Sequence, residues 1–461
     1  MPKFNGIAPV ITPRVPYVPI GPSEWFKEMG IEDKNGGPPP SMGEDLSRAS
    51  VYVKDGQLAE GNAATIYGGT VSPEKVENLK VVTYDGNVGG IFVEGAASNV
   101  TVEGAVISLS GEGHGLGEKT AGAGVSDHAT LTVKDSLIDA NGLSRTCTSA
   151  SGGSTLRVYD SVLVSHGAPY GDDAPEGSPK MSPPAALEIQ GNNRTHCTVQ
   201  KSFSYFYNCL VTCDGWAALS TDMSDGYVYL EANDCRVVST KSGYGAYADW
   251  GCHDVFNGCT FDVANQGAII AGEASVEFSD CKVNCGTYLA HVHCVMGRHT
   301  ETGELTVESS TVNTKKEAIT VRGQNVVIDL IDSTITSEAG VLVHTMKNTD
   351  PNASQVLGRP TPGVEVNLYD MAACGDILHE DPERDMRVNL VSSSLRGAVQ
   401  NAYISLDAGS SWYATADSAV TLASEVDQAQ IDAPAGVTIT AKAASGAGSY
   451  TLYSGGTLVV E

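Results

Sequence analysis

The feature that most constrains the fold is a short element that recurs six times between residues 202 and 345. Each copy is a strand-like run, rich in Val, Thr, Ile and small residues, that ends in a turn residue followed by Cys or Ser. The six pairs are Asn208-Cys209, Asp234-Cys235, Gly258-Cys259, Asp280-Cys281, Ser309-Ser310 and Asp332-Ser333. Their second members lie 26, 24, 22, 29 and 23 positions apart. A period in the low twenties predicts a solenoid of stacked coils.

The same element occurs upstream at Ser136 and Ser161, which lie 25 positions apart. The 48 positions from Ser161 to Cys209 are interpreted as two periods that include an insertion at 166–184. Further insertions are expected at 111–124 and 346–363. Solenoids accept insertions at their corners, where binding sites often form.

Composition favours strands over helices. The chain has 51 Gly and only 7% aromatic residues, which suits short strands and tight turns. Residues 1–47 are rich in Pro, which cannot donate to a β-ladder, so they are expected to form an irregular N-terminal cap on a solenoid that spans 48–461. The expected helix is a short one at 22–29. The predicted fold class is therefore all-β.

Charge and cysteine content limit the partners and the compartment. A formal net charge of -27 argues against nucleic acid and anionic membranes as partners, because both attract basic surfaces. Four of the eleven cysteines recur at the coil period, which predicts a buried ladder of reduced thiols. Reduced thiols and the lack of a visible signal peptide favour the cytoplasm, although a trimmed secreted protein would look the same. The sequence leaves the oligomeric state open.

The coil signature carries a resemblance. Coils of 22 to 29 residues with a V-x-D/N-S/C-x-I/V pattern look like the right-handed parallel β-helix proteins of the pectate-lyase-like group. The runs 216–222 and 242–249 are similar to bacterial β-helix proteins of unassigned activity. The resemblance implies a right-handed parallel β-helix but no particular reaction, because that fold carries lyases, hydrolases, epimerases and adhesins. No catalytic residue is carried over, because no pectate-lyase calcium site or polygalacturonase aspartate motif is present.

Alternation along one strand of each coil predicts a polar strip on the outside of the solenoid. The residues placed inward are Ala246, Ala248, Ala290, Val292, Ile319, Val321, Val341 and Val343. Those placed outward are Tyr247, Asp249, His291, His293, Thr320, Arg322, Leu342 and His344, with Ile270 and Glu273 from one coil and Asp222, Glu188 and Gln190 from upstream coils. Because equivalent residues in adjacent coils lie ~4.8 Å apart, these groups are expected to share one exposed surface.

This strip predicts acid–base chemistry on a carbohydrate-like or other cyclic hydroxylated small molecule. His291 or His293 would be the base, with the other histidine or Tyr247 as the acid. Asp249 would orient an imidazole, and Arg322 would hold an anion, with His344 nearby. The residues expected to contact the substrate are Tyr244, Trp250, Asp222, Glu188, Gln190 and Glu273. The expected reaction is proton abstraction next to a carbonyl or carboxylate, as in a lyase, epimerase or isomerase.

Three alternatives remain open at this point. A glycoside hydrolase would use a carboxylate pair drawn from Asp222, Asp249 and Glu273. A non-catalytic carbohydrate-binding or adhesive β-helix would need no such pair. No cofactor is expected, although His291 and His293 could hold a divalent metal with Asp249 or His344 completing its ligands.

Overall fold

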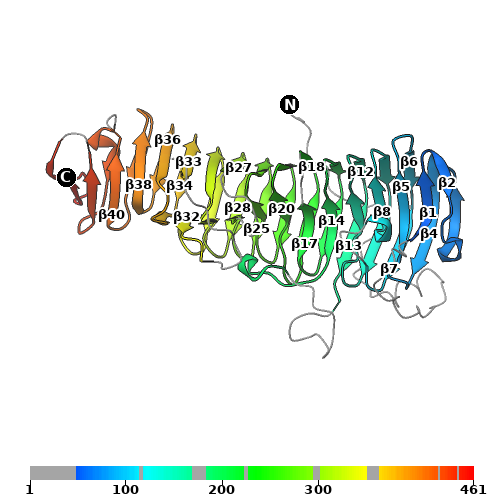
Figure 1. The fold of residues 1–461 in the computed structure, drawn as a ribbon. Helices are drawn as coiled ribbons and strands as arrows, with labels where there is room; N and C mark the ends of the chain where they lie inside the picture. The colour runs from blue at the N-terminus through cyan, green and yellow to red at the C-terminus, as the bar shows by residue number, and fades with distance from the viewer. Residues whose placement is uncertain are drawn as a thin grey trace. The chain divides into compact units, whose positions relative to one another are not determined.

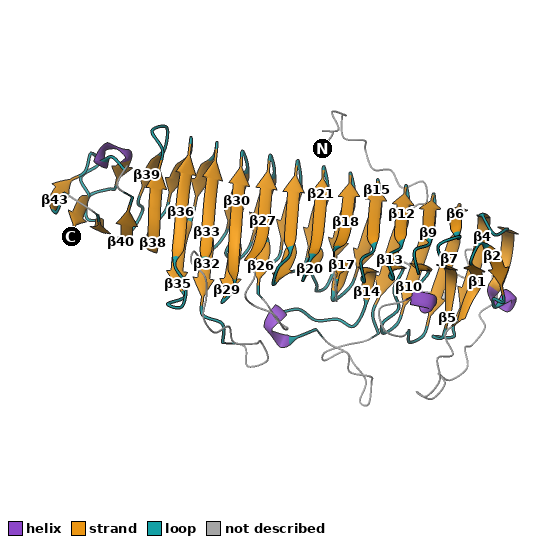
Figure 2. Ribbon diagram, turned by 45° about the horizontal axis from the view of Figure 1, so that its top comes forward, coloured by secondary structure: helices purple, strands orange, loops and turns teal. Residues whose placement is uncertain are grey.

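The protein is an all-β parallel β-helix (Figures 1 and 2). The structure is a computed structural model that describes residues 48–113, 118–168, 183–222, 227–293, 302–349, 363–423, 426–443 and 446–461. The chain divides into two compact units: Met1–Tyr247 with Gly251–Ala264, and Ala248–Trp250 with Asn265–Glu461. The predicted cap and its short helix lie outside the described residues, as do the central parts of the three predicted insertions.

Unit 1 is built from coils of three strands each. The first strands are β6 (Asn99–Glu103), β9 (Thr130–Lys134), β12 (Thr155–Tyr159), β15 (Phe203–Tyr207), β18 (Val228–Asn233) and β21 (Cys252–Asn257). The second strands are β7 (Val106–Ser110), β10 (Leu137–Asn141), β13 (Val162–His166), β16 (Leu210–Cys213), β19 (Arg236–Ser239) and β22 (Thr260–Val263). The third strands are β1 (Arg48–Lys54), β5 (Val88–Glu94), β8 (Ala123–Ser126), β11 (Thr148–Ala150), β14 (Arg194–Thr198) and β17 (Ala217–Thr221).

The first coils carry three more strands and unit 1 has three short 3-10 helices among its described residues. These are β2 (Gln57–Ala59), β3 (Ile66–Val71) and β4 (Lys75–Thr83), with η1 (Ala63–Thr65), η2 (Glu118–Thr120) and η4 (Ala185–Leu187). β20 (Ala246–Asp249) spans the division between the units. Each coil strand pairs in parallel with its counterpart one coil away, so β10 lies between β7 and β13.

The register corrects the interpretation of the longest interval. Val162 pairs directly with Leu210, so β13 and β16 are neighbours and the 48 positions from Ser161 to Cys209 form one coil. The extra residues fall between β13, which ends at His166, and β14, which begins at Arg194. Counting two periods was wrong because spacing alone cannot separate an added coil from a long excursion out of the same coil.

The turn between first and second strands explains the repeated sequence element. Asp135, Asp160, Asn208 and Asp234 adopt positive φ angles of 47 to 52°, a left-handed conformation that Asp and Asn tolerate better than most residues. The next residue faces inward. The Cys209 N–H donates to Cys235 Sγ at 3.4 Å, and the Cys235 N–H donates to Cys259 Sγ at 3.3 Å. The predicted thiol ladder is confirmed, and the ten described cysteines are all free.

Unit 2 repeats the three-strand coil. Its first strands are β24 (Ser275–Ser279), β27 (Thr302–Glu308), β30 (Asn325–Ile331), β33 (Val364–Tyr369) and β36 (Met386–Val391). Its second strands are β25 (Lys282–Cys285), β28 (Thr311–Thr314), β31 (Thr334–Ser337), β34 (Ala372–Cys374) and β37 (Ser394–Arg396). Its third strands are β23 (Ala268–Ala271), β26 (Ala290–Val292), β29 (Ile319–Arg322), β32 (Val341–Met346) and β35 (Asp376–Glu380).

The C-terminal coils of unit 2 are less regular. They contain β38 (Val399–Leu406), β39 (Ser411–Tyr413), β40 (Ser418–Leu422), β41 (Ile431–Asp432), β42 (Thr438–Lys442), β43 (Gly448–Thr451) and β44 (Thr457–Val460), with the 3-10 helix η5 (Gln428–Gln430). The long strand β38 pairs with both β35 and β36, so the three-strand pattern ends there.

The third strands of unit 2 confirm the predicted alternation and correct one residue. Ile270, Val292 and Val321 align in one inward row. A Cβ built on Gly303 would lie 3.0 Å from the Ile270 side chain, which places Ile270 among the residues of the interior. The prediction that Ile270 faces outward was therefore wrong. Ile269 takes the outward place, in the same row as His291, Thr320 and His344.

Candidate functional site

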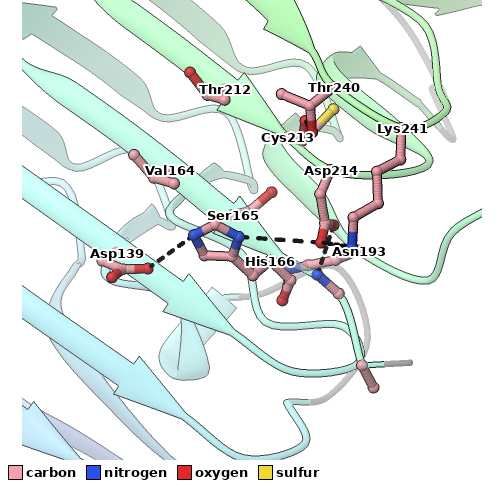
Figure 3. A network of polar contacts seen from close by, with 12 residues as sticks. Asp139, Val164, Ser165, His166, Asn193, Thr212, Cys213, Asp214, Thr240 and Lys241 are labelled. Atoms are coloured by element: carbon pink, nitrogen blue, oxygen red, sulfur yellow. Dashed lines mark hydrogen bonds and ion pairs between the residues drawn. The ribbon is translucent and has the colours of Figure 1, made fainter. Parts of the chain in front are cut away.

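A polar cluster of unit 1 lies where successive second strands end (Figure 3). Asp139 is on β10, His166 ends β13, Asp214 follows β16 and Lys241 follows β19. Parallel stacking sets these coils ~4.8 Å apart, so residues from four coils converge on one outer surface. We call Asp139, His166, Asp214 and Lys241 the His166 cluster.

The imidazole of His166 lies between two carboxylates (Figure 3). Its Nε2 is 3.9 Å from Asp139 Oδ1, and its Nδ1 is 4.0 Å from Asp214 Oδ2. Lys241 Nζ is 3.6 Å from the same Asp214 oxygen. The other oxygen of Asp214 accepts a hydrogen bond from the Gly167 N–H at 2.9 Å, which anchors this carboxylate beside the ring. The two imidazole contacts exceed hydrogen-bonding distance, as is common for catalytic groups before substrate binds.

Burial shifts the pKa values of two members in opposite directions. Desolvation raises the pKa of Asp139 to about 7. Desolvation also lowers the pKa of His166, a shift that the Asp214 carboxylate opposes and the Lys241 ammonium reinforces. Near neutral pH the cluster therefore combines a neutral imidazole with a carboxyl group that is partly protonated. Such a pair can act as a general base and a general acid.

The desolvation of Asp139 has a visible source. Asp139 pairs with Ser108 on one side and with Val164 on the other, and Val164 packs with Leu137, Val162 and Leu210 in one buried apolar cluster. Asp139 is only 6% exposed, and its Oδ1 has no hydrogen-bond partner among the described residues. Thr212 Oγ1, aligned with Asp139 through Val164, is likewise buried without such a partner. Unsatisfied buried groups of this kind often mark functional sites.

A second group of unit 1 residues is linked to the His166 cluster through Asn193. Asn193 Nδ2 donates to the His166 carbonyl at 3.5 Å, and the next residue, Arg194, forms an ion pair with Asp222 at 2.8 Å. The guanidinium of Arg194 lies over the Trp216 ring at 4.7 Å. The predicted substrate-contacting residue Asp222 is therefore buried and already neutralised by an arginine.

Tyr244 and Tyr247, predicted to contact the substrate and to act as the acid, lie side by side in unit 1. The Tyr244 and Tyr247 rings stack with centroids 5.6 Å apart. Tyr244 Oη and Ser220 Oγ are hydrogen-bonded at 2.9 Å. Both tyrosines are buried, so the predicted exposure of Tyr247 on the outer strip was wrong.

Glu188 and Gln190 do not lie on a strand. Glu188 follows η4 in the left-handed conformation, and β14 begins only at Arg194. Both side chains are exposed. Their predicted place on the strip was wrong because Ala186 to Gln190 reads as an alternating strand, whereas the insertion delays the return of the chain to the stack.

In unit 2 the predicted histidines face outward but are not exposed. His291 and His293 stack with centroids 5.6 Å apart, and both are fully buried. His293 Nδ1 lies 3.3 Å from the Arg322 carbonyl oxygen. The prediction of an exposed strip was therefore wrong here, because alternation gives the direction of a side chain and not its burial.

The remaining predicted residues of unit 2 have separate settings. His344 contacts Glu317 at 3.5 Å and Glu380 at 3.4 Å, so it is paired with glutamates. Asp249 is buried, Trp250 and Arg322 are half-buried, and Glu273 is exposed. Tyr244, Tyr247 and Asp222 belong to unit 1, whereas Asp249, the histidines and Arg322 belong to unit 2.

A metal at His291 and His293 receives no support from the geometry. Across the described ranges, no group of three or more His, Cys, Asp or Glu side chains is arranged to hold a metal ion. The positive charges of Arg322 and Lys316 also act on His291, which disfavours a cation beside it.

Sequence reasoning missed the His166 cluster. The signal was present, because aligning the second strands on Ser136, Ser161 and Cys209 places Asp139, Val164 and Thr212 in one row. The interval from Ser161 to Cys209 was interpreted as two periods, so β13 and β16 were not expected to be neighbours and this alignment was missed.

Comparisons with known proteins add no assignment: no family model, curated protein or solved structure matches this chain. In the part of the chain that the structure describes, no helix is long and apolar enough to cross a membrane.

Proposed function

We propose that this protein is an enzyme that transfers protons to and from a small hydroxylated molecule, in the manner of an isomerase, epimerase or lyase, at the His166 cluster. The observation that supports this most directly is the 3.9 Å approach of His166 Nε2 to a largely buried Asp139 carboxyl. A base and an acid so close together suit a reaction that removes a proton from carbon and protonates the neighbouring carbonyl oxygen.

Each member of the cluster has a defined role in this proposal. His166 Nε2 removes the proton from carbon, and Asp214 stabilises the imidazolium that forms. Asp139, in its protonated form, donates to the substrate oxygen that gains negative charge. Lys241, whose side chain is 67% exposed, attracts an anionic group of the substrate to the rim of the site.

The pH dependence follows from the two shifted groups. The base must be deprotonated, and the pKa of His166 is lowered by its burial. The acid must be protonated, and the pKa of Asp139 is about 7. The rate is therefore expected to follow a bell-shaped profile, whose alkaline limb lies near pH 7 and reports Asp139, and whose acidic limb reports His166 and lies below the ordinary titration range of histidine.

A glycoside hydrolase is the second candidate. Asp139 and Asp214 flank His166 on opposite sides, and the raised pKa of Asp139 suits the acid role in a carboxylate pair. Membership of the pectate-lyase-like group belongs to the same proposal: the parallel coils are compatible with it and do not by themselves choose the reaction.

Solvent deuterium exchange tests the proposal across a panel of candidate substrates. Sugars and sugar acids are incubated with the protein in D₂O, and proton NMR follows loss of the signal at the carbon next to the carbonyl. The wild type is expected to exchange or isomerise at least one compound, and His166→Gln and Asp139→Asn are each expected to lower that rate by roughly 10²- to 10⁴-fold.

Asp262→Asn is the matched control. Asp262 lies in the same outward row of second strands as Asp139, but its side chain is 39% exposed and paired with Arg236 at 3.3 Å. Full activity of His166→Gln would refute the base assignment. Release of new reducing ends from oligosaccharides, lost in Asp139→Asn and Asp214→Asn, would select the hydrolase instead.

A further inference from the structure

Two neighbouring residues on the third strands of unit 2 bury polar atoms that make no hydrogen bond with any described residue. They are Nδ1 and Nε2 of His291 and Oγ1 of Thr320. The two residues pair in register on β26 and β29, so they are adjacent in the outward row. His291 is 0% exposed and Thr320 is 1% exposed. Water therefore does not satisfy these atoms at the surface.

Orphaned polar atoms at this depth require an explanation. A buried donor or acceptor without a partner is destabilising, and native structures hold few of them. Here three occur on two neighbouring side chains of the same row. A single ligand that reaches both side chains would satisfy all three, whereas a rearrangement of one side chain would not.

The surrounding charges indicate the sign of such a ligand. Desolvation lowers the pKa of His291 well below its usual value, and the positive charges of Arg322, His293 and Lys316 lower it further. Lys316 also lies over the Tyr288 ring at 5.1 Å, and Tyr288 contacts His291 edge-on with centroids 5.7 Å apart. The field at His291 is therefore positive, which favours an anion.

The imidazole adds a second requirement. A neutral histidine has one nitrogen that donates and one that accepts. A ligand that satisfies both nitrogens must offer an acceptor and a donor. An oxyanion supplies the acceptor and a hydroxyl group supplies the donor, and the Thr320 hydroxyl can bond to either.

We propose that His291, Thr320 and Arg322 form a binding site for a small hydroxylated anion, whose oxyanion is a carboxylate or a phosphate. This site lies in unit 2 and does not depend on the reaction proposed at His166 in unit 1. The ligand's oxyanion accepts from the His291 N–H and the Thr320 hydroxyl beside the guanidinium of Arg322, and its hydroxyl group donates to the other nitrogen of His291.

Calorimetric titration of the full-length protein tests this site with three probes. D-Gluconate carries a carboxylate and hydroxyl groups, inorganic phosphate carries only the other oxyanion, and D-glucitol is uncharged. Gluconate or phosphate is expected to bind, and glucitol is not. Binding of gluconate alone identifies a hydroxylated carboxylate, and tighter binding of phosphate identifies a phosphorylated ligand. Failure of both anions to bind would overturn the proposal.

Variants locate the binding. Thr320→Val removes one hydroxyl without changing the shape of the side chain and is expected to weaken binding tenfold or more, because hydrogen bonds to charged groups are strong. Thr311→Val, at an exposed position on β28, is the matched control and is expected to bind as the wild type does. Equal affinity of Thr320→Val and the wild type would show that the anion binds elsewhere and refute the assignment.

Thermal stability and a variant of the His166 cluster separate loss of binding from loss of folding or of the other site. Since Thr320 Oγ1 has no partner among the described residues, Thr320→Val is expected to melt no lower than the wild type in the absence of anion. If it fails to fold, Arg322→Gln takes its place in the titration with the same expectation. Asp139→Asn is expected to lose the exchange reaction but to keep gluconate binding, which separates failure of this site from failure of the His166 cluster.

Discussion

Replacing Asp139 by Asn should stabilise the protein at alkaline pH and leave its stability at acidic pH nearly unchanged. The folded-state pKa of Asp139 is about 7, above an unfolded value near 3.9. The folded protein therefore favours the protonated carboxyl. The contribution of the Asp139 carboxyl to the free energy of unfolding is fully present below pH ~4 and is lost as the pH rises through about 7. Asn cannot ionise, so the variant avoids this loss.

The magnitude follows from the size of the shift. A difference of about three pKa units corresponds to about 4 kcal/mol at pH values above 7. Asp139 is 6% exposed, so solvent screening reduces this value little, and about 4 kcal/mol is an upper estimate. The gain should grow steadily between pH 4 and pH 7 and then level off.

Urea unfolding of the wild type and Asp139→Asn at several pH values between 4 and 9 measures this difference. Asp262→Asn provides the control, because Asp262 belongs to the same row but its side chain is only half-buried. A gain that is equal at pH 4 and pH 8 would mean that Asn improves packing rather than removing a buried charge. The absence of any gain at pH 8 would show that Asp139 is not desolvated, and the acid role assigned to it would fail as well.

Three other perturbations have expected outcomes. Burial lowers the pKa of His196 to about 3, so the contribution of the neutral imidazole to stability is complete above pH ~6.5 and falls by up to about 5 kcal/mol as the pH drops toward 3. The free energy of unfolding of His196→Gln should therefore decrease less on acidification than that of the control His128→Gln, whose histidine is exposed. Cys235→Ser should cost less than about 1 kcal/mol because Ser occupies the same turn position in other coils, whereas Cys235→Val removes the acceptor of the Cys209 N–H and should cost about 1–3 kcal/mol in the same denaturation assay. Arg194→Met leaves Asp222 buried without its ion-pair partner and should lower the free energy of unfolding by about 3–5 kcal/mol. Adding Asp222→Asn should recover part of that loss. If the double variant recovers nothing, the loss comes from the packing of Arg194 on Trp216 instead.

The coil architecture could be predicted because its determinants are local. A left-handed turn residue followed by a small inward side chain is visible as Asp-Ser or Asp-Cys, and its spacing gives the coil length. Alternation also gave the correct direction for His291 and Thr320, because a strand has only two faces.

Burial and long-range register could not be predicted in the same way. His291 faces outward yet is completely buried, and alternation carries no information about what covers a strand. The adjacency of Val162 and Leu210 depends on how a long insertion returns to the stack. Because the His166 cluster is assembled across that insertion, an error in the coil count removed the whole cluster from consideration.

The direct pairing of β13 with β16 has an evolutionary consequence. Hydrogen bonds between adjacent coils hold the frame on both sides of the departure point, so the intervening segment can lengthen, shorten or change composition without disturbing the alignment of Asp139 with Thr212. Selectivity for different molecules could therefore diversify through that one segment while the groups proposed to transfer protons stay fixed. Related chains that differ mainly there would be expected to share chemistry and to differ in what they accept.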